Sequence, residues 1–477
     1  MRLPHLTMSL LLLSWLGTAS LVVADPLPVP PPDVPATAQP SPSPSAQPDT
    51  ETSPTYYKTF LDGSRPLGFA PDQHLFDQVR DNIHLEAYES PSDTQIYKTA
   101  EGEARALVTQ AGQKPDALDR IQPNGHMAQE IVGAYSRTID KNLIWYALIR
   151  GELRSLDDPY SVLMIPDDYR HMMDSMEERS FGGIGVYIEL DKNNDNKLTV
   201  TEPIDGTPAA KAGLEAGDVI ADIDGKSTDG MAIDTAAAML RGEIGSKVRL
   251  GIDRKGNNAP LDVDVTRDSI HPVTVTSRML EKHIGYVRLR LFGEHTGTEL
   301  AEALDDLRTQ GMKALVLDLR NNGGGYIRTA VDVCSNFVPA GDLIVSVEHR
   351  TGTPEELRAH PTPLSAHPLP MVLLVNGYSA SASEITAGCL KDLGVATLVG
   401  VKTFGKGSVQ NVEKLPQGAA LKLTIAHFFS PKHNPIHHVG VLPDVEVPME
   451  PKLVGHDGDA QLTKAVDVLA SRLNAMR

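Results

Sequence analysis

A stretch of alternating serines and alanines, Tyr-Ser-Ala-Ser-Ala-Ser-Glu-Ile from Tyr378 to Ile385, could serve either chemistry or structure. It follows the apolar run 371–376 and precedes apolar residues at helical spacing, so the pattern predicts a strand, a turn and a helix. Ser381 and Glu384 have the spacing of a capping box, in which the serine only begins the helix. A hydroxyl there also lies beside the N–H groups of a helix N-terminus, which can stabilise an oxyanion. By itself, the stretch favours the capping role.

Two further segments supply what a catalytic serine would need. A serine is protonated at neutral pH and becomes a nucleophile only beside a base. Lys406 stands between Gly405 and Gly407 after another predicted buried strand, where the short backbone could let its amine approach another chain segment. The segment LVLDLRNNGGGYI predicts one more strand, turn and helix. Its glycines at 323–325 expose backbone N–H groups that side chains would otherwise obstruct.

The surrounding segments predict how these residues are positioned. From residue 271 to 477, apolar runs such as ALVLDLR and MVLLVN alternate with helical patterns, which predicts β-α-β units around a largely buried sheet. This part closes with an amphipathic helix. Residues 67–178 have mostly helical patterns, whereas residues 179–270 alternate short strands with glycine turns. We therefore expect a multidomain α/β protein with a helical N-terminal region and a small β domain.

Four stretches, DLRNNGGG, NGYSASASEITAG, VGVKTFGKGSVQ and GVLPDVEV, resemble in order and spacing the signature blocks of the C-terminal processing peptidases, also called tail-specific proteases. The resemblance extends from about Leu156 to the C-terminal helix. It implies a serine endopeptidase with a ClpP/crotonase-like core, an inserted PDZ domain and a helical lid. By position, it implies Ser381 as the nucleophile, Lys406 as the general base and Gln410 as a residue that orients the lysine.

In such a site the tetrahedral oxyanion would be held by the backbone N–H of Ala382 and by that of Gly324 or Gly325. The sequence departs from the family pattern at two places. Gly323 stands where the family often has proline, which loosens the turn but leaves the next two glycines available. The segment SPKHNPIHH replaces a small glycine-containing turn, so the shape of that loop stays open.

Residues 179–270 resemble a PDZ domain in the stretches SFGGIGVYIEL and DGTPAAKAGLEAGDVIADIDGKSTDG. A glycine turn can hold a terminal carboxylate with its N–H groups, and the strand after it can accept a peptide strand at its edge. Apolar pockets beside that edge would favour substrates with free, apolar C-termini. We expect this peptide to bind at Gly182, Gly183, Ile184, Gly185 and Val186.

The N-terminus predicts export. Arg2 precedes an apolar run that ends at Ala24, and Val22 and Ala24 offer the small residues that signal peptidases accept, so we expect residues 1–24 to be a signal peptide cleaved after Ala24. Residues 25–66 are rich in proline and serine, which predicts a disordered linker. No later segment is long and apolar enough to span a membrane. We expect an exported protein, located in the periplasm.

Composition excludes several other functions. A formal net charge of −18 argues against nucleic acid or an anionic membrane as the main partner. Two cysteines, Cys334 and Cys389, cannot build a disulfide framework, and whether they pair is left open. His433, His437 and His438 have a proline-broken spacing that fits no regular metal motif. A Ser–Lys mechanism needs no metal or cofactor.

Two other classes of function remain open. A non-catalytic PDZ adaptor on an inactive core would predict loss of Ser381 or Lys406, and both are present. A ligand carrier on the same core would need no basic residue at position 406. The sequence does not identify the substrate, and it leaves open an adaptor protein or a second copy of the chain as a partner.

Overall fold

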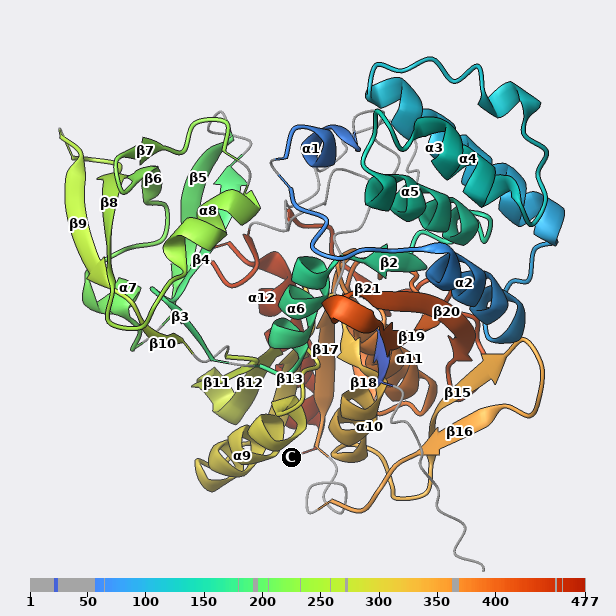
Figure 1. Cartoon of the computed structure of the whole chain (residues 1–477). Coiled ribbons are helices and arrows are strands. Elements are labelled where there is room, and N and C mark those ends of the chain that lie inside the picture. Colours follow the sequence, from blue (N-terminus) through green and yellow to red (C-terminus); the bar gives the residue numbers. More distant parts are fainter. Residues whose placement is uncertain are drawn as a thin grey trace, which may run out of the picture.

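The structure is a computed structural model. It describes residues 21–24 and 56–476, apart from positions 64, 179, 192–195, 205, 232, 258, 271–272, 363–368, 451–452 and 457. The predicted signal peptide, except its last four residues, and most of the predicted linker lie outside the described residues. Figure 1 shows three regions: a helical region, a small β domain and a larger α/β core.

The core is built around a six-stranded sheet whose central strands β13, β17 and β18 are nearly continuous apolar runs, as expected for a sheet covered on both faces. Its order is β11-β12-β13-β17-β18-β21, and all neighbours from β12 to β21 are parallel, whereas β11 is antiparallel to β12. The strands span Val275–Leu280, Ile284–Leu289, Ala314–Asp318, Met371–Val375, Ala396–Gly400 and Val445–Glu446 in that order.

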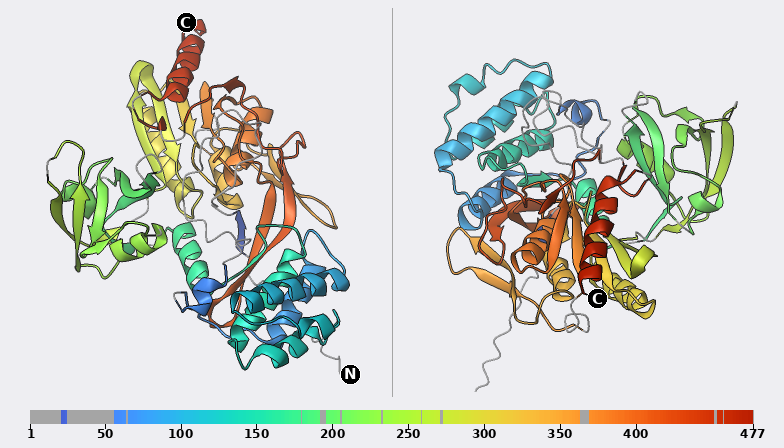
Figure 2. Two further views of the ribbon diagram at one scale, coloured as in Figure 1. Left: turned by 90° about the horizontal axis from the view of Figure 1, so that it is seen from above. Right: turned by 180° about the vertical axis from the view of Figure 1, so that it is seen from behind.

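Alternate residues of these strands point to opposite faces, so each strand contributes to two apolar clusters. Leu315 and Leu373 belong to the cluster that includes the buried faces of α9, α10 and α11. Val316 and Leu374 face the other way, toward α12. Figure 2 shows this last helix lying along its own side of the sheet. The four helices span Thr296–Thr309, Ile327–Ser335, Ala382–Asp392 and Ala460–Ala475.

A second sheet joins the core to the helical region. Its order is β14-β1-β19-β20-β15-β16, and β2 also pairs with β20. The bounds of its strands are Gly325–Tyr326 for β14, Leu21–Ala24 for β1, Ser408–Lys414 for β19, Ala420–Phe429 for β20, Leu343–His349 for β15, Glu355–Arg358 for β16 and Val162–Met164 for β2. Leu421 and Leu423 of β20 pack into the apolar cluster of the helical region. The helical region is therefore fixed to the core through β20.

The helical region itself contains α2, α3, α4, α5 and α6, which span Gln73–Leu85, Asp93–Gln110, Met127–Tyr135, Lys141–Arg154 and Pro166–Met176. Residues 143–153 of α5 are all buried, because this helix packs between its neighbours and the sheet. A short helix, α1 (Lys58–Leu61), precedes them. Among the described residues, no helix combines the length and apolar character needed to cross a bilayer.

The small β domain has a sheet of order β4-β5-β6-β8-β9 and its own apolar core. These strands span Val186–Asp191, Lys197–Pro203, Val219–Ile223, Lys247–Asp253 and Leu261–Thr266, and the helix α8 spans Ile233–Leu240. The two ends of the domain, β3 (Phe181–Gly183) and β10 (Asp268–Ile270), pair with each other. The chain therefore enters and leaves the domain side by side, as an inserted domain does.

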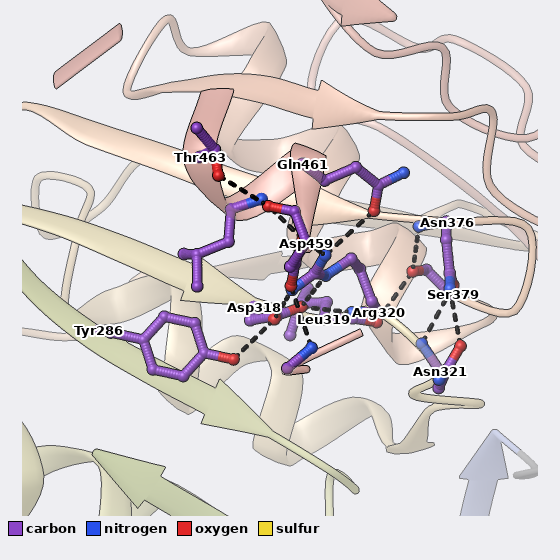
Figure 3. Close-up of polar contacts among 12 residues, drawn as sticks. Tyr286, Asp318, Leu319, Arg320, Asn321, Asn376, Ser379, Asp459, Gln461 and Thr463 are labelled. Carbon is purple, nitrogen blue, oxygen red and sulfur yellow. Dashed lines mark hydrogen bonds and ion pairs between the residues drawn. The ribbon is translucent and has the colours of Figure 1, made fainter. Parts of the chain in front are cut away.

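A completely buried arginine connects α12 to the sheet (Figure 3). Arg320 donates to Asp318 from Nε (2.9 Å) and Nη2 (2.6 Å), and to Asp459 from Nη1 and Nη2 (2.8 Å each). Asp459 also caps α12 by accepting the N–H of Leu462 at 2.8 Å. Burial opposes the charge of Arg320, but Asp318 and Asp459 outweigh it and hold the arginine pKa above its usual value. The pair fixes the start of α12 directly beside the loop that follows β13.

Cys334 and Cys389 are both free and buried, on α10 and α11 respectively. The structure thus has no bridge between them.

The buried ion pair gives a stability prediction. Asp459→Ala removes one of the two carboxylates that bind the buried guanidinium of Arg320. We expect the unfolding free energy to fall by about 3–5 kcal/mol, because part of a buried charge is left unpaired. Equilibrium urea denaturation followed by circular dichroism measures this loss. The matched control is Glu356→Ala, which removes an acidic partner of Arg358 at half-exposed side chains and costs at most about 1 kcal/mol. Equal effects of the two variants would contradict the prediction.

Candidate active site

Ser381 lies directly before the first residue of α11, and its backbone is strained. Its φ of 57° and ψ of −114° fall outside the regions that a residue with a Cβ normally adopts. Strain of this kind persists where the surroundings enforce it, and it is concentrated at functional sites. The side chain is completely buried, and its Oγ has no hydrogen-bond partner among the described residues. The hydroxyl is therefore not used to cap the helix.

The two neighbouring serines are used structurally. Ser379 Oγ donates to the carbonyl of Leu319 (2.8 Å) and accepts the N–H of Asn376 (2.9 Å). Ser383 Oγ donates to the carbonyl of Asn322 at 2.8 Å. The bonds to the carbonyls of Leu319 and Asn322 tie the Ser381 turn to the segment after β13. Figure 3 shows the Ser379 part of this network.

Glu384 joins the Ser381 turn to the Lys406 loop. Its carboxylate accepts hydrogen bonds from the N–H groups of Ser381 (2.9 Å), Gly405 (2.6 Å) and Lys406 (2.8 Å), and from the hydroxyl of Thr403 (2.6 Å). The residue is completely buried, and burial raises the pKa of Glu384 to about 7 although the four donors act in the opposite direction. The glutamate side of the capping box predicted from the sequence is formed, because Glu384 accepts the Ser381 N–H.

Lys406 is also completely buried, in the loop between β18 and β19. Its Nζ lies 4.5 Å from the centroid of the Tyr160 ring, over the face of that ring. Glycine is required next to it, because a Cβ on Gly407 would come within 2.3 Å of the backbone nitrogen of His437. The short backbone predicted around the lysine therefore allows a close approach to the loop before residue 440.

Gln410 lies on β19 and is completely buried. Its Nε2 donates to the hydroxyls of Ser408 and Thr424, each at 3.0 Å. Its Oε1 is buried and accepts no hydrogen bond in the part of the chain that the structure describes. The amide is therefore held by its nitrogen, and its oxygen is left as an acceptor.

The glycine turn after β13 lies against Ser381. A Cβ on Gly324 would lie 2.8 Å from the Ser381 Cβ and 3.0 Å from the Ala382 nitrogen, so glycine is needed for this contact. The N–H of Gly324 already donates to Asn322 Oδ1 at 2.9 Å. Ala382 is the first residue of α11, and the first N–H groups of a helix have no intrahelical acceptor. Of the residues predicted to bind the oxyanion, Gly324 therefore has its N–H engaged by Asn322, whereas the N–H of Ala382 has no acceptor within α11.

The small β domain forms a second candidate site. A cavity of about 360 Å³ is lined by residues 183–188, by Ala237, Leu240 and Arg241 at the end of α8, and by Asp174, Ser175, Arg290 and Leu291 outside the domain. Four of the five predicted peptide-binding residues line it. Gly182 does not; its carbonyl instead accepts the N–H of Gly242 at 3.0 Å. The strand β4 is an edge strand of this sheet.

Three site features were not recognised from the sequence. The sequence pattern does not indicate Tyr160 as a site residue, although this tyrosine directly follows the turn signal Asp-Pro at 158–159. The acceptor role of Glu384 toward Gly405 and Lys406 has no local signal. The contacts among the histidine rings are a third such feature: the centroid of the His437 ring lies 4.3 Å from that of His427 and 3.9 Å from that of His438, both tilted, and burial lowers the pKa of His437 to about 4.

Two parts of the chain match known protein families. Residues 283–447 match peptidase family S41, and residues 199–254 match a PDZ domain. The carboxyl-terminal-processing protease of Picosynechococcus is 38% identical over 68% of this chain and 78% of that protein. CtpA, a carboxy-terminal processing protease of Bacillus subtilis, is 37% identical over 68% of each chain. A putative S41 protease of Bacteroides fragilis shares the fold, with a TM-score of 0.51 at 20% identity over 68% of this chain and 90% of that chain.

The buried glutamate gives a pH prediction. The pKa of Glu384 is raised from 4.5 to about 7 in the folded state, so its contribution to stability is present below about pH 4.5 and is lost as the pH rises through about 7. We expect the unfolding free energy of the wild type, relative to Glu384→Gln, to fall by on the order of 3 kcal/mol across this window. Urea denaturation at a series of pH values measures the difference.

The control for this prediction is Glu355→Gln, the same substitution at an exposed position of β16. Its stability should follow that of the wild type at every pH. A difference between the wild type and Glu384→Gln that does not change with pH would show that Glu384 does not titrate in this range.

Proposed function

The chain belongs to peptidase family S41, among the carboxyl-terminal processing proteases, and carries a PDZ domain; from this premise we propose that Ser381 and Lys406 form its catalytic dyad. The observation that carries the proposal is the shared carboxylate of Glu384. It binds the backbone of both residues and so holds the turn of the nucleophile beside the loop of the base. The alternative of an inactive adaptor would predict loss of Ser381 or Lys406, and both residues are present.

The proposed reaction begins with proton transfer. The neutral Lys406 amine takes the proton from Ser381 Oγ while the oxygen forms a bond to the substrate carbonyl carbon. Complete burial favours the neutral amine over the ammonium before the reaction. The ammonium then gives its proton to the leaving amine as the peptide bond breaks, and water releases the acyl group by the same steps. The free Oγ and the strained backbone of Ser381 suit this role.

The negative charge that develops on the carbonyl oxygen needs donors already in place. In our proposal these are the N–H groups of Ala382 and Gly325, since that of Gly324 is engaged by Asn322. Gln410 would support the base through Oε1, which is buried without a partner among the described residues and could accept from the lysine. The core has the β-α repeats expected of a ClpP/crotonase-like fold, and the helical region would act as a lid.

Substrate would enter as an added strand. The backbone of Leu21–Ala24 pairs antiparallel with β19 on one side and with β14 on the other. The space between these strands thus accepts one extended segment, whose Ala24 lies opposite Gly325. Once the predicted signal peptide has been removed, a substrate strand would take this place, and its backbone would be directed at the proposed oxyanion donors.

The PDZ domain would select the substrates. Its cavity is lined by apolar residues of β4 and α8, which suits an apolar C-terminal tail added to the edge of β4. Asp174 and Ser175 of α6 line the same cavity, so a bound tail would contact the helical region directly and could shift it away from the dyad. We further propose that the protein is exported to the periplasm, on the strength of its N-terminal sequence.

The dyad is tested by two substitutions. Ser381→Ala and Lys406→Ala should each lower kcat for a peptide substrate by at least about 10³-fold, because each removes a group that acts in the transition state. The controls are Ser383→Ala, which loses one neutral hydrogen bond, and Lys402→Ala, at an exposed position of the same loop. Both should retain most activity. An active Ser381→Ala enzyme would refute the dyad.

Tail recognition is tested on the substrate. A peptide with an apolar C-terminus should be cleaved faster as the free acid than as the C-terminal amide, since amidation removes the charge and no side chain changes. We expect the difference to appear mainly in KM, at about tenfold or more, because a charged hydrogen bond contributes about 1.5–3 kcal/mol. Equal rates for the acid and the amide would show that the PDZ domain does not read free tails.

A further inference from the structure

The helical region contributes one side chain to the proposed base. Tyr160 belongs to the segment Asp-Pro-Tyr-Ser at 158–161, which follows α5 and precedes β2. Its ring lies over Lys406, with Nζ 4.5 Å from the ring centroid. This distance is within the range of about 6 Å over which an aromatic face attracts a cation.

The turn that carries the ring is firmly held. Asp158 accepts the N–H of Tyr160 at 3.1 Å and the hydroxyl of Ser161 at 2.6 Å. Ser161 Oγ in turn accepts the N–H of Thr424 in β20 at 3.0 Å, and Thr424 Oγ1 accepts from Gln410. One chain of hydrogen bonds therefore runs from the turn of Tyr160 to Gln410 on β19. The ring is positioned by the core and not only by its own loop.

The Tyr160 ring can stabilise the positive charge that Lys406 acquires when it acts as a base. Lys406 is completely buried, so the ammonium that forms when it takes a proton is poorly solvated. The charged or titratable groups that act on this region include Glu384 from α11, Asp158 from the turn, and His427, His437 and His438 from β20 and the following loop. An aromatic face stabilises the ammonium without adding a negative charge. A carboxylate in its place would stabilise the ammonium more strongly, and it would keep the lysine protonated before the reaction.

We propose that Tyr160 is a positioning residue for the base: its ring holds Lys406 beside the nucleophile and stabilises the ammonium that forms in the transition state. The inference rests on the proposed Ser–Lys dyad. In the step concerned, the proton leaves Ser381 Oγ for Lys406 Nζ, the Oγ electron pair forms the bond to the carbonyl carbon, and the carbonyl π electrons move to the oxygen. The helical region is then part of the catalytic site as well as its cover.

The test compares Tyr160→Phe with Tyr160→Leu in the full-length protein. Tyr160→Phe keeps the aromatic face and should stay within about threefold of the wild-type kcat. Tyr160→Leu fills much of the space without a π face, so kcat should fall by about tenfold, while KM changes less than about twofold. Because the leucine also stabilises the ammonium less before reaction, the acidic limb of the pH profile of kcat/KM should move to lower pH by about one unit.

The direction of that movement separates the proposal from a structural role. If Tyr160→Leu only disturbs the packing of the site, kcat should fall and the acidic limb of the pH profile should stay in place. If the variant admits water to Lys406, the acidic limb should move to higher pH. Either result would overturn the proposal. Tyr88→Leu is the matched control, because the Tyr88 ring stacks on His427, whereas the Tyr160 ring lies over Lys406. The acidic limb of the pH profile of kcat/KM should not move in this variant.

A second series covers the case in which Tyr160→Leu does not fold. Phenylalanines with increasing ring fluorination at position 160 keep nearly the same shape while the aromatic face loses its attraction for cations. We expect kcat to fall stepwise through this series, and an unchanged kcat would contradict the proposal. Lys406→Ala separates failure of the dyad from failure of the proposal for Tyr160. An active Lys406→Ala enzyme refutes the dyad. An inactive Lys406→Ala enzyme together with unaffected Tyr160 variants refutes only the role of Tyr160.

Discussion

The site depends on a single buried carboxylate. Burying Glu384 is costly, because a charged group loses its hydration inside a protein. Four donors compensate for that cost, and they come from two segments: the turn of Ser381 and the loop 403–406. Neither segment can move without leaving a buried donor or the carboxylate unpaired. The positions of nucleophile and base are therefore coupled through the backbone, before any contact between their side chains.

A second buried charge extends this constraint through the core. Arg320 lies between Asp318 at the end of β13 and Asp459 at the start of α12. The residues directly after it, Asn321 and Asn322, bind Asn376 and the carbonyl of Leu289. The glycine turn follows at once. The C-terminal helix, the parallel sheet and the turn beside Ser381 thus share one continuous polar network, which Figure 3 shows in part.

Much of the fold could be predicted because it is encoded in local patterns. The apolar runs 314–318 and 371–375 form buried parallel strands, and the glycines at 324 and 325 adopt the positive φ values that only glycine readily adopts. The resemblance to a protease family identified Ser381 and Lys406 as the residues to examine. The contacts could not be predicted in the same way. The spacing of Ser381 and Glu384 predicts the capping box, but nothing local predicts that the same carboxylate also binds the N–H groups of Gly405 and Lys406.

The sequence by itself therefore determined the elements, the order of the regions and the types of residue available for chemistry, since hydrophobic periodicity and turn residues act over a few positions. Only the tertiary structure decided which donors are already engaged and which groups are buried. Asn322 takes the N–H of Gly324, and Tyr160 covers Lys406 from the helical region. Burial and hydrogen-bond competition depend on segments that are far apart along the chain and are brought together only when the three regions pack, so no local pattern encodes them.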